Sequence, residues 1–149
     1  MVKSMKTLIR LNEWNVDQHR RVLAEFLGQL SELEGTLEAL EEEVLREQSK
    51  AAAMPEEGGF LYGNYAQGVI IRREELTKRI IEMEEKVAAA REVLNEAYRE
   101  LKKFEVVEEN RIRREREEEA RTEQALLDEM GLQTYSRRMA QNSNQRKTV

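Results

Sequence analysis

Apolar side chains between residues 9 and 44 recur at alternating intervals of three and four, interrupted only by two polar residues. The positions are Ile9, Asn12, Val16, His19, Leu23, Phe26, Leu30, Leu33, Leu37, Leu40 and Val44. A seven-residue repeat of this kind keeps a narrow apolar seam on one side of an α-helix and favours a left-handed supercoil with a second helix. The pattern therefore predicts a long helix, over about residues 5–50, that needs a helical partner.

A second stripe with the same spacing follows a short break. It consists of Leu76, Ile80, Met83, Val87, Ala90, Leu94, Ala97, Leu101 and Phe104. Proline and glycine are strong breaks in helical sequence, and Pro55, Gly58, Gly59 and Gly63 all fall between the two stripes. We therefore predict an all-α fold, a long antiparallel two-helix coiled-coil hairpin, with a turn at about 54–63 and a second helix over about 64–130.

The facing partners within the hairpin can also be predicted from the two stripes. The preferred register sets Val44 against Leu76 and places Glu47 beside Arg73 in the next layer toward the turn. A register shifted by one heptad sets Leu40 against Arg73, which is less favourable for a buried seam. We accordingly expect the first register.

The second stripe stops after Phe104, because Glu108, Arg111 and Glu115 occupy the positions where the next apolar residues would fall. The first helix is too short to cover this region, so the C-terminal helix should overhang the hairpin. Gly131 is a suitable helix C-cap. Residues 1–132 then form a single coiled-coil domain, and 133–149, which contain basic but no acidic residues, form a flexible basic tail.

Composition supports long helices and argues against several functions. Charged residues make up 37% of the 149 residues, aromatic residues only 5%, and there is one proline. This profile is typical of extended helices rather than of a core that could enclose an enzyme pocket. The net charge of −5 argues against bulk attraction to nucleic acid. There is no cysteine and no apolar run of about 18 residues, so we expect a cytoplasmic protein without a membrane-spanning helix.

The sequence contains no recognisable set of catalytic, cofactor-binding or metal-binding residues. His19 is the only histidine, and the carboxylates are spread along helical faces. A pH switch or a base is conceivable for His19, but we interpret it, like Asn12, as a polar seam residue that helps to fix the register. We therefore expect no enzyme activity and no cofactor.

Two groups of apolar residues exceed what the seam needs, and we predict partner-binding surfaces there. One surrounds Tyr62 and Tyr65 near the turn, where a thin two-helix tip cannot bury every side chain. The other contains Ala125, Leu126, Leu127, Met130 and Leu132 in the overhanging helix, where the chain offers no partner. Exposed apolar groups of this kind mark contact sites, although self-association through the second group is equally open.

Three segments resemble the FliJ family of flagellar export proteins, most closely the alphaproteobacterial branch. They are KTLIRLNEWNVDQHRR at 6–21, ELKKFEVVEENRIRREREEEAR at 100–121 and LLDEMGL at 126–132. The resemblance covers most of the chain in the same order, whereas the segment MPEEGGFLYGNY departs from the family.

The resemblance implies a non-enzymatic rotor-stalk-like coiled coil of the flagellar type III export apparatus, located peripheral to the membrane-embedded part. Its expected partners are the export ATPase hexamer, the cytoplasmic domain of the export gate and export chaperones, with the chain itself a monomer. We include Arg113 and Arg114 among the partner-binding residues. The alternatives are the equivalent stalk of a virulence secretion system and a generic homo-oligomeric coiled coil.

Overall fold

The computed structural model describes residues 2–148, apart from the side chains of residues 2, 3, 57, 58 and 60. Two helices account for nearly all of this range: α1, Val2–Ala53, and α2, Pro55–Lys147. Within the described residues there is no strand, which confirms the all-α prediction. The chain divides into two compact units at residue 103, and each is described separately below.

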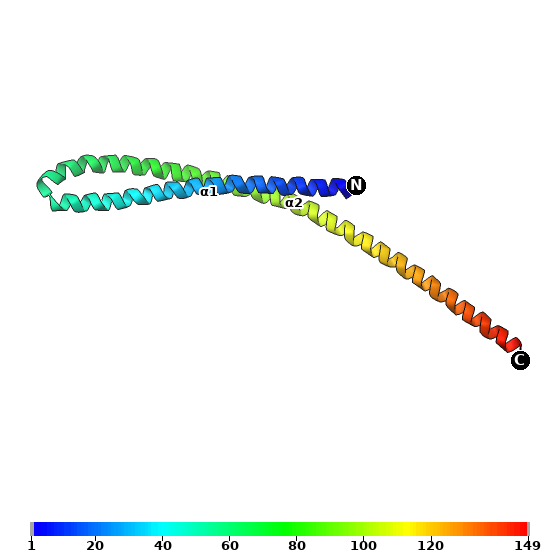
Figure 1. Ribbon diagram of the computed structural model, residues 1–149. Coiled ribbons are helices and arrows are strands. Elements are labelled where there is room, and N and C mark those ends of the chain that lie inside the picture. Colours follow the sequence, from blue (N-terminus) through cyan, green and yellow to red (C-terminus); the bar gives the residue numbers. More distant parts are fainter. Residues whose placement is uncertain (1, 149) are drawn as a thin grey trace. The chain divides into compact units, whose positions relative to one another are not determined.

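The first unit, which ends at Lys102, is an antiparallel hairpin of α1 and the first part of α2 (Figure 1). Near the turn, the Nε of Arg73 donates to the Glu41 carboxylate at 2.6 Å. Further from the turn, the Nε of Arg20 donates to the Tyr98 hydroxyl at 2.6 Å, and the same guanidinium lies 5.2 Å from the centre of the tyrosine ring. As the residue number in α1 falls from Glu41 to Arg20, the number of the paired residue in α2 rises from Arg73 to Tyr98. This is the predicted antiparallel arrangement.

The seam between the two helices contains the residues that the periodicity predicts. Along α1, the least exposed side chains follow the alternating three- and four-residue intervals from Ile9 to Glu47. The buried apolar residues of the hairpin are Val16, Leu40, Val44, Val69, Val87 and Ala90. No described side chain is completely buried, as expected for a two-helix coil in which each seam residue is covered from one side only.

The register near the turn differs from the preferred prediction. Arg73 pairs with Glu41 rather than Glu47, and Val44 clusters with Leu40 and Val69. Leu76, the predicted partner of Val44, only packs against this cluster. These contacts lie closer to the alternative register, which looked unfavourable because it placed an arginine in the seam. A long arginine stem can cover apolar surface while its guanidinium reaches a carboxylate at the rim.

The turn is much shorter than the predicted ten-residue break. Met54 alone separates the two helices, and its backbone N–H donates to the Ala51 carbonyl at 3.3 Å. Pro55 opens α2, at the position where a proline costs no hydrogen bond and its fixed φ suits the helix. Figure 1 shows the first turns of α2 curving across the tip, and the glycines of this stretch remain helical with no positive φ.

The second unit, from residue 103 onward, is a continuation of α2, and it runs further than predicted. The helix passes through Gly131 and ends at Lys147, so Gly131 is not its C-cap. Local contacts support this extension: the hydroxyl of Thr134 donates to the carbonyl of Met130, and the amide of Gln124 donates to Asp128. With 93 residues against 52 in α1, α2 exceeds what α1 can pair with, in line with the predicted overhang.

Replacing Gly35 by alanine should stabilise the hairpin. Gly35 lies inside α1 with a helical backbone, and an added Cβ would meet no atom within 4 Å. Alanine loses less conformational freedom on folding, so the free energy of unfolding should rise by about 1 kcal/mol. Urea denaturation followed by circular dichroism measures the change. The matched control, Ala24→Gly on the exposed side of the same helix, should lower stability by a similar amount.

Candidate partner-binding surfaces

The two predicted tyrosines lie together at the tip of the hairpin. Both are half-buried, and their ring centres are 6.2 Å apart with the planes inclined by 44°. They line an open groove of about 250 Å³ together with Glu47, Lys50, Ala51, Met54 and Leu61. Met54 and Leu61 are about two-thirds exposed, so this groove presents apolar surface to solvent.

The hydroxyl of Tyr65 lies in an apolar and acidic environment. Its oxygen is inaccessible to solvent, and burial raises the pKa of the phenol above 10.0. The nearby carboxylates of Glu43 and Glu47 raise this pKa further, because a phenolate would be repelled by both. The tyrosine therefore stays neutral and can offer a partner its ring edge but no negative charge.

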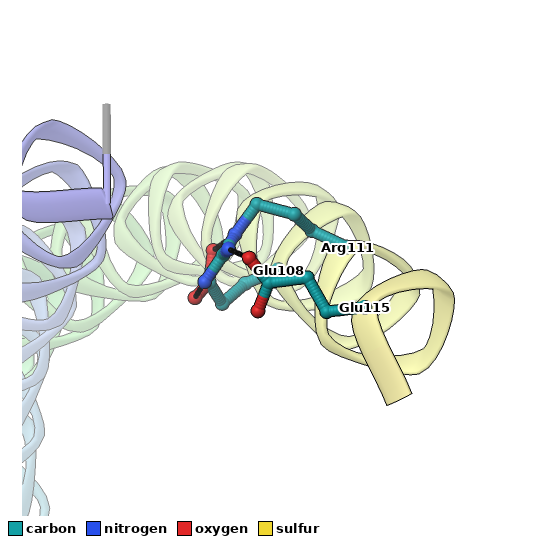
Figure 2. Close-up of polar contacts among 3 residues, drawn as sticks. All are labelled: Glu108, Arg111 and Glu115. Carbon is teal, nitrogen blue, oxygen red and sulfur yellow. Dashed lines mark hydrogen bonds and ion pairs between the residues drawn. The ribbon is translucent and has the colours of Figure 1, made fainter. Parts of the chain in front are cut away.

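In the second unit, charged side chains form a compact cluster where the apolar stripe ends. Arg111 donates from two nitrogens to the Glu108 carboxylate at 3.1 and 2.8 Å and from a third to Glu115 at 2.8 Å (Figure 2). Glu108 is only 8% exposed, the one described charged residue that is buried. The hydrogen bonds to Glu108, together with both carboxylate charges, raise the pKa of Arg111. The cluster thus pairs a buried carboxylate with a guanidinium at the position where the next apolar residue of the stripe would fall.

The predicted C-terminal surface lies on a helix whose described side chains are all exposed from residue 113 onward. Leu126, Leu127 and Met130 are each more than half exposed. Leu126 and Met130 are four residues apart and share one helical face, with Leu127 beside it. Arg113 and Arg114 are exposed on the same helix, N-terminal to this face.

A second apolar face of this helix combines Leu132, which belongs to the predicted group, with Tyr135 and Met139, which were missed because the tail was predicted to lack structure. Leu132, Tyr135 and Met139 are each more than half exposed. Their spacing of three and four residues places them on one helical face, and at 100° per residue this face is roughly opposite to that of Leu126 and Met130. The signal was present in the sequence, but it becomes a surface only when the helix continues through Gly131.

The described residues also bear on metal binding and on membrane insertion. Among the described residues, no group of three or more His, Cys, Asp or Glu side chains could hold a metal ion. No helix in the described part of the chain is long and apolar enough to cross a membrane. His19 is half-buried in α1, at the seam position that its spacing predicts.

Comparison with known proteins identifies the family. Residues 1–140 match the family described as Flagellar FliJ protein. The chain belongs to the FliJ family. Flagellar FliJ proteins from two strains of Caulobacter vibrioides, NA1000 / CB15N and ATCC 19089 / CIP 103742 / CB 15, are each 31% identical to it over 109 residues. The aligned part covers 73% of this chain and 78% of each relative.

No solved structure matches the chain. The FliJ match includes the tip groove, the apolar residues of the second unit and the charged cluster around Arg111, and it ends within α2. Membership makes the protein a component of the flagellar export apparatus, which favours the flagellar interpretation over a virulence stalk or a generic coiled coil.

Replacing Arg111, the cation of the charged cluster with Glu108 and Glu115, should destabilise the helix around it. In Arg111→Met, the buried Glu108 carboxylate loses two hydrogen bonds from the guanidinium and Glu115 loses one. Charge-assisted hydrogen bonds to a buried carboxylate are costly to remove, so the melting temperature should fall at neutral pH. Arg113→Met, on an exposed position of the same helix, is the matched control and should change it much less. Equal melting temperatures for the two variants would show that the cluster does not contribute.

Proposed function

We propose that this chain is the stalk of the flagellar export machinery, which binds the export ATPase ring and promotes its assembly and activity. It contacts the cytoplasmic domain of the export gate with another surface and handles export chaperones. It works without catalysis of its own. Membership of the FliJ family supports a role in the flagellar export apparatus. The main observation in favour of partner binding is the exposed apolar face of the second unit.

The hairpin suits a stalk because its two helices bury each other's apolar stripes. The apolar stripes of α1 and α2 cover each other within one chain, so the paired part needs no second subunit to fold. Its outer faces are rich in charge, and cross-helix contacts such as Arg73 with Glu41 lie at the edge of the seam. A stiff, self-contained coil can therefore transmit torque or position between partners while it exposes separate binding surfaces.

The C-terminal surface is suited to binding the ATPase ring. Leu126, Leu127 and Met130 are all exposed, so their apolar surfaces gain no burial within the chain. Such side chains become favourable when a partner removes them from water, at about 25 cal/mol per Å² of apolar area. Arg113 and Arg114 lie on the same helix and offer cations to acidic groups of that partner.

The tip is suited to a second partner. Its groove combines the apolar surfaces of Met54 and Leu61 with the rings of Tyr62 and Tyr65, and tyrosines are frequent anchors of protein interfaces. Because this groove belongs to the first unit and Leu126 to the second, the two surfaces can be changed independently. We assign the tip groove to the export gate.

The ATPase assignment predicts a loss of stimulation. The variant Leu126→Gln with Met130→Gln should lower stimulation of purified export ATPase at least about tenfold, because two apolar anchors are removed. Deletion of residues from Arg121 onward should abolish stimulation and leave gate binding intact. Leu132→Gln with Met139→Gln, on the opposite face, is the matched control and should retain stimulation. Full stimulation by the truncated chain would overturn the assignment.

The gate assignment predicts the reverse pattern. Tyr62→Ala with Tyr65→Ala should weaken binding to the gate's cytoplasmic domain about tenfold or more, measured by calorimetry, since two aromatic anchors are lost. Helicity by circular dichroism and ATPase stimulation should stay unchanged. Ile81→Ala, at another exposed apolar position of α2, is the control. If affinity for the gate domain is the same in all variants, the tip is not its binding site.

A further inference from the structure

The apolar face formed by Leu132, Tyr135 and Met139 remains unused by the function proposed above. It lies on the second unit, and each of its side chains is more than half exposed. Its residues point roughly opposite to Leu126 and Met130, so occupying one face leaves the other accessible. An exposed apolar face of this kind favours a binding partner, and the charges along the helix indicate which partner it is.

From residue 115 onward, the charged residues before Leu132 are mostly acidic and those after it are basic. From residue 115 to 129 there are seven acidic and two basic residues, whereas from 133 to 149 there are four basic residues and no acid. The basic part is helical as far as Lys147. A helix that is acidic before its centre and basic after it complements the same helix in the opposite direction.

The seven-residue spacing makes this complementarity specific. Glu118, Ala125, Leu132, Met139 and Arg146 are each seven residues apart, so they occupy the same position of five successive heptads. The series is centred on Leu132. An antiparallel copy centred there sets Met139 against Ala125 and Arg146 against Glu118. Each of these layers then joins a large side chain to a small one, a cation to an anion, or leucine to leucine.

The parallel arrangement is unfavourable for the same reason. It sets Arg146 beside Arg146 and Glu118 beside Glu118 at both ends of the contact, and like charges in adjacent positions repel. We propose that the second unit pairs antiparallel with the second unit of another copy of this chain, centred on Leu132, in a reversible two-fold symmetric dimer. The contact is isologous, because each helix contributes the same face.

The dimer contact is independent of the ATPase and gate assignments. It uses neither Leu126 and Met130 nor the tip groove, so a failed stimulation experiment would leave it intact. It also involves no part of the hairpin seam, so each chain remains a folded monomer when the helices separate.

A charge-swap series tests the pairing in the full chain. Sedimentation velocity over a range of concentrations should show a reversible monomer–dimer equilibrium. Arg146→Glu alone and Glu118→Arg alone should each weaken the dimer about fivefold or more, because both symmetric contacts become repulsive. The double variant restores both pairs and should recover the dimer. A monomer at every concentration, or a double variant no tighter than the single ones, would overturn the proposal.

Cysteine crosslinking tests the direction, since the chain contains no cysteine of its own. Leu132→Cys lies at the two-fold axis and should give a disulfide-linked dimer on mild oxidation. Arg146→Cys should not crosslink to itself, because the two positions are roughly 40 Å apart in the antiparallel pair, but it should crosslink to Glu118→Cys when the two variants are mixed. Self-crosslinking of Arg146→Cys would show a parallel pair and overturn the model.

Leu126→Cys provides the matched control for the face. It lies on the same unit with similar exposure but roughly opposite to Leu132. It should crosslink to itself far more slowly than Leu132→Cys. Equal rates for the two variants would mean that collisions rather than a defined contact bring the helices together, and the proposal would fail.

Discussion

The seven-residue spacing of the apolar side chains is the constraint on which the hairpin depends. It confines the buried surface to a strip about two side chains wide, so that each helix covers only one side of the other. The buried residues, such as Val16 and Val87, therefore form successive layers along the coil, with one small cluster near the turn, rather than one large core. Because no other described side chain of the first unit is buried deeply, the length and direction of this strip decide where the chain is paired.

Periodicity was sufficient to predict the helices, their antiparallel pairing and the seam positions. These depend on side-chain spacing alone, which is fully visible in the sequence. The register near the turn was not predictable in this way, because it depends on whether an arginine can share a seam. Arg73 does so by directing its guanidinium to Glu41 at 2.6 Å, a property of side-chain length that a simple count of polar residues in the seam does not capture.

The helix boundaries illustrate a second limit of sequence reasoning. Proline and glycine predicted a long turn, but Pro55 opens α2 and the following glycines adopt helical conformations. Gly131 likewise does not end the helix. Glycine lowers helical stability without forbidding the conformation, so neighbouring residues decide the outcome. The candidate surfaces were partly recognised: the two tyrosines do meet at the tip, whereas Tyr135 and Met139 were missed because their helix was expected to have ended.

The contrast between a paired and an unpaired stretch of α2 has a consequence for local stability. Amides within the hairpin can exchange with solvent only when seam contacts open as well, so their protection reflects tertiary packing. From residue 113 to the end of α2, every described side chain is exposed, and only hydrogen bonds within the helix and short-range side-chain pairs oppose opening. This stretch should behave as a separate cooperative unit with rapid amide exchange. A partner that binds this stretch must supply the free energy that keeps the helix folded. This cost lowers the affinity of the partner and speeds its dissociation.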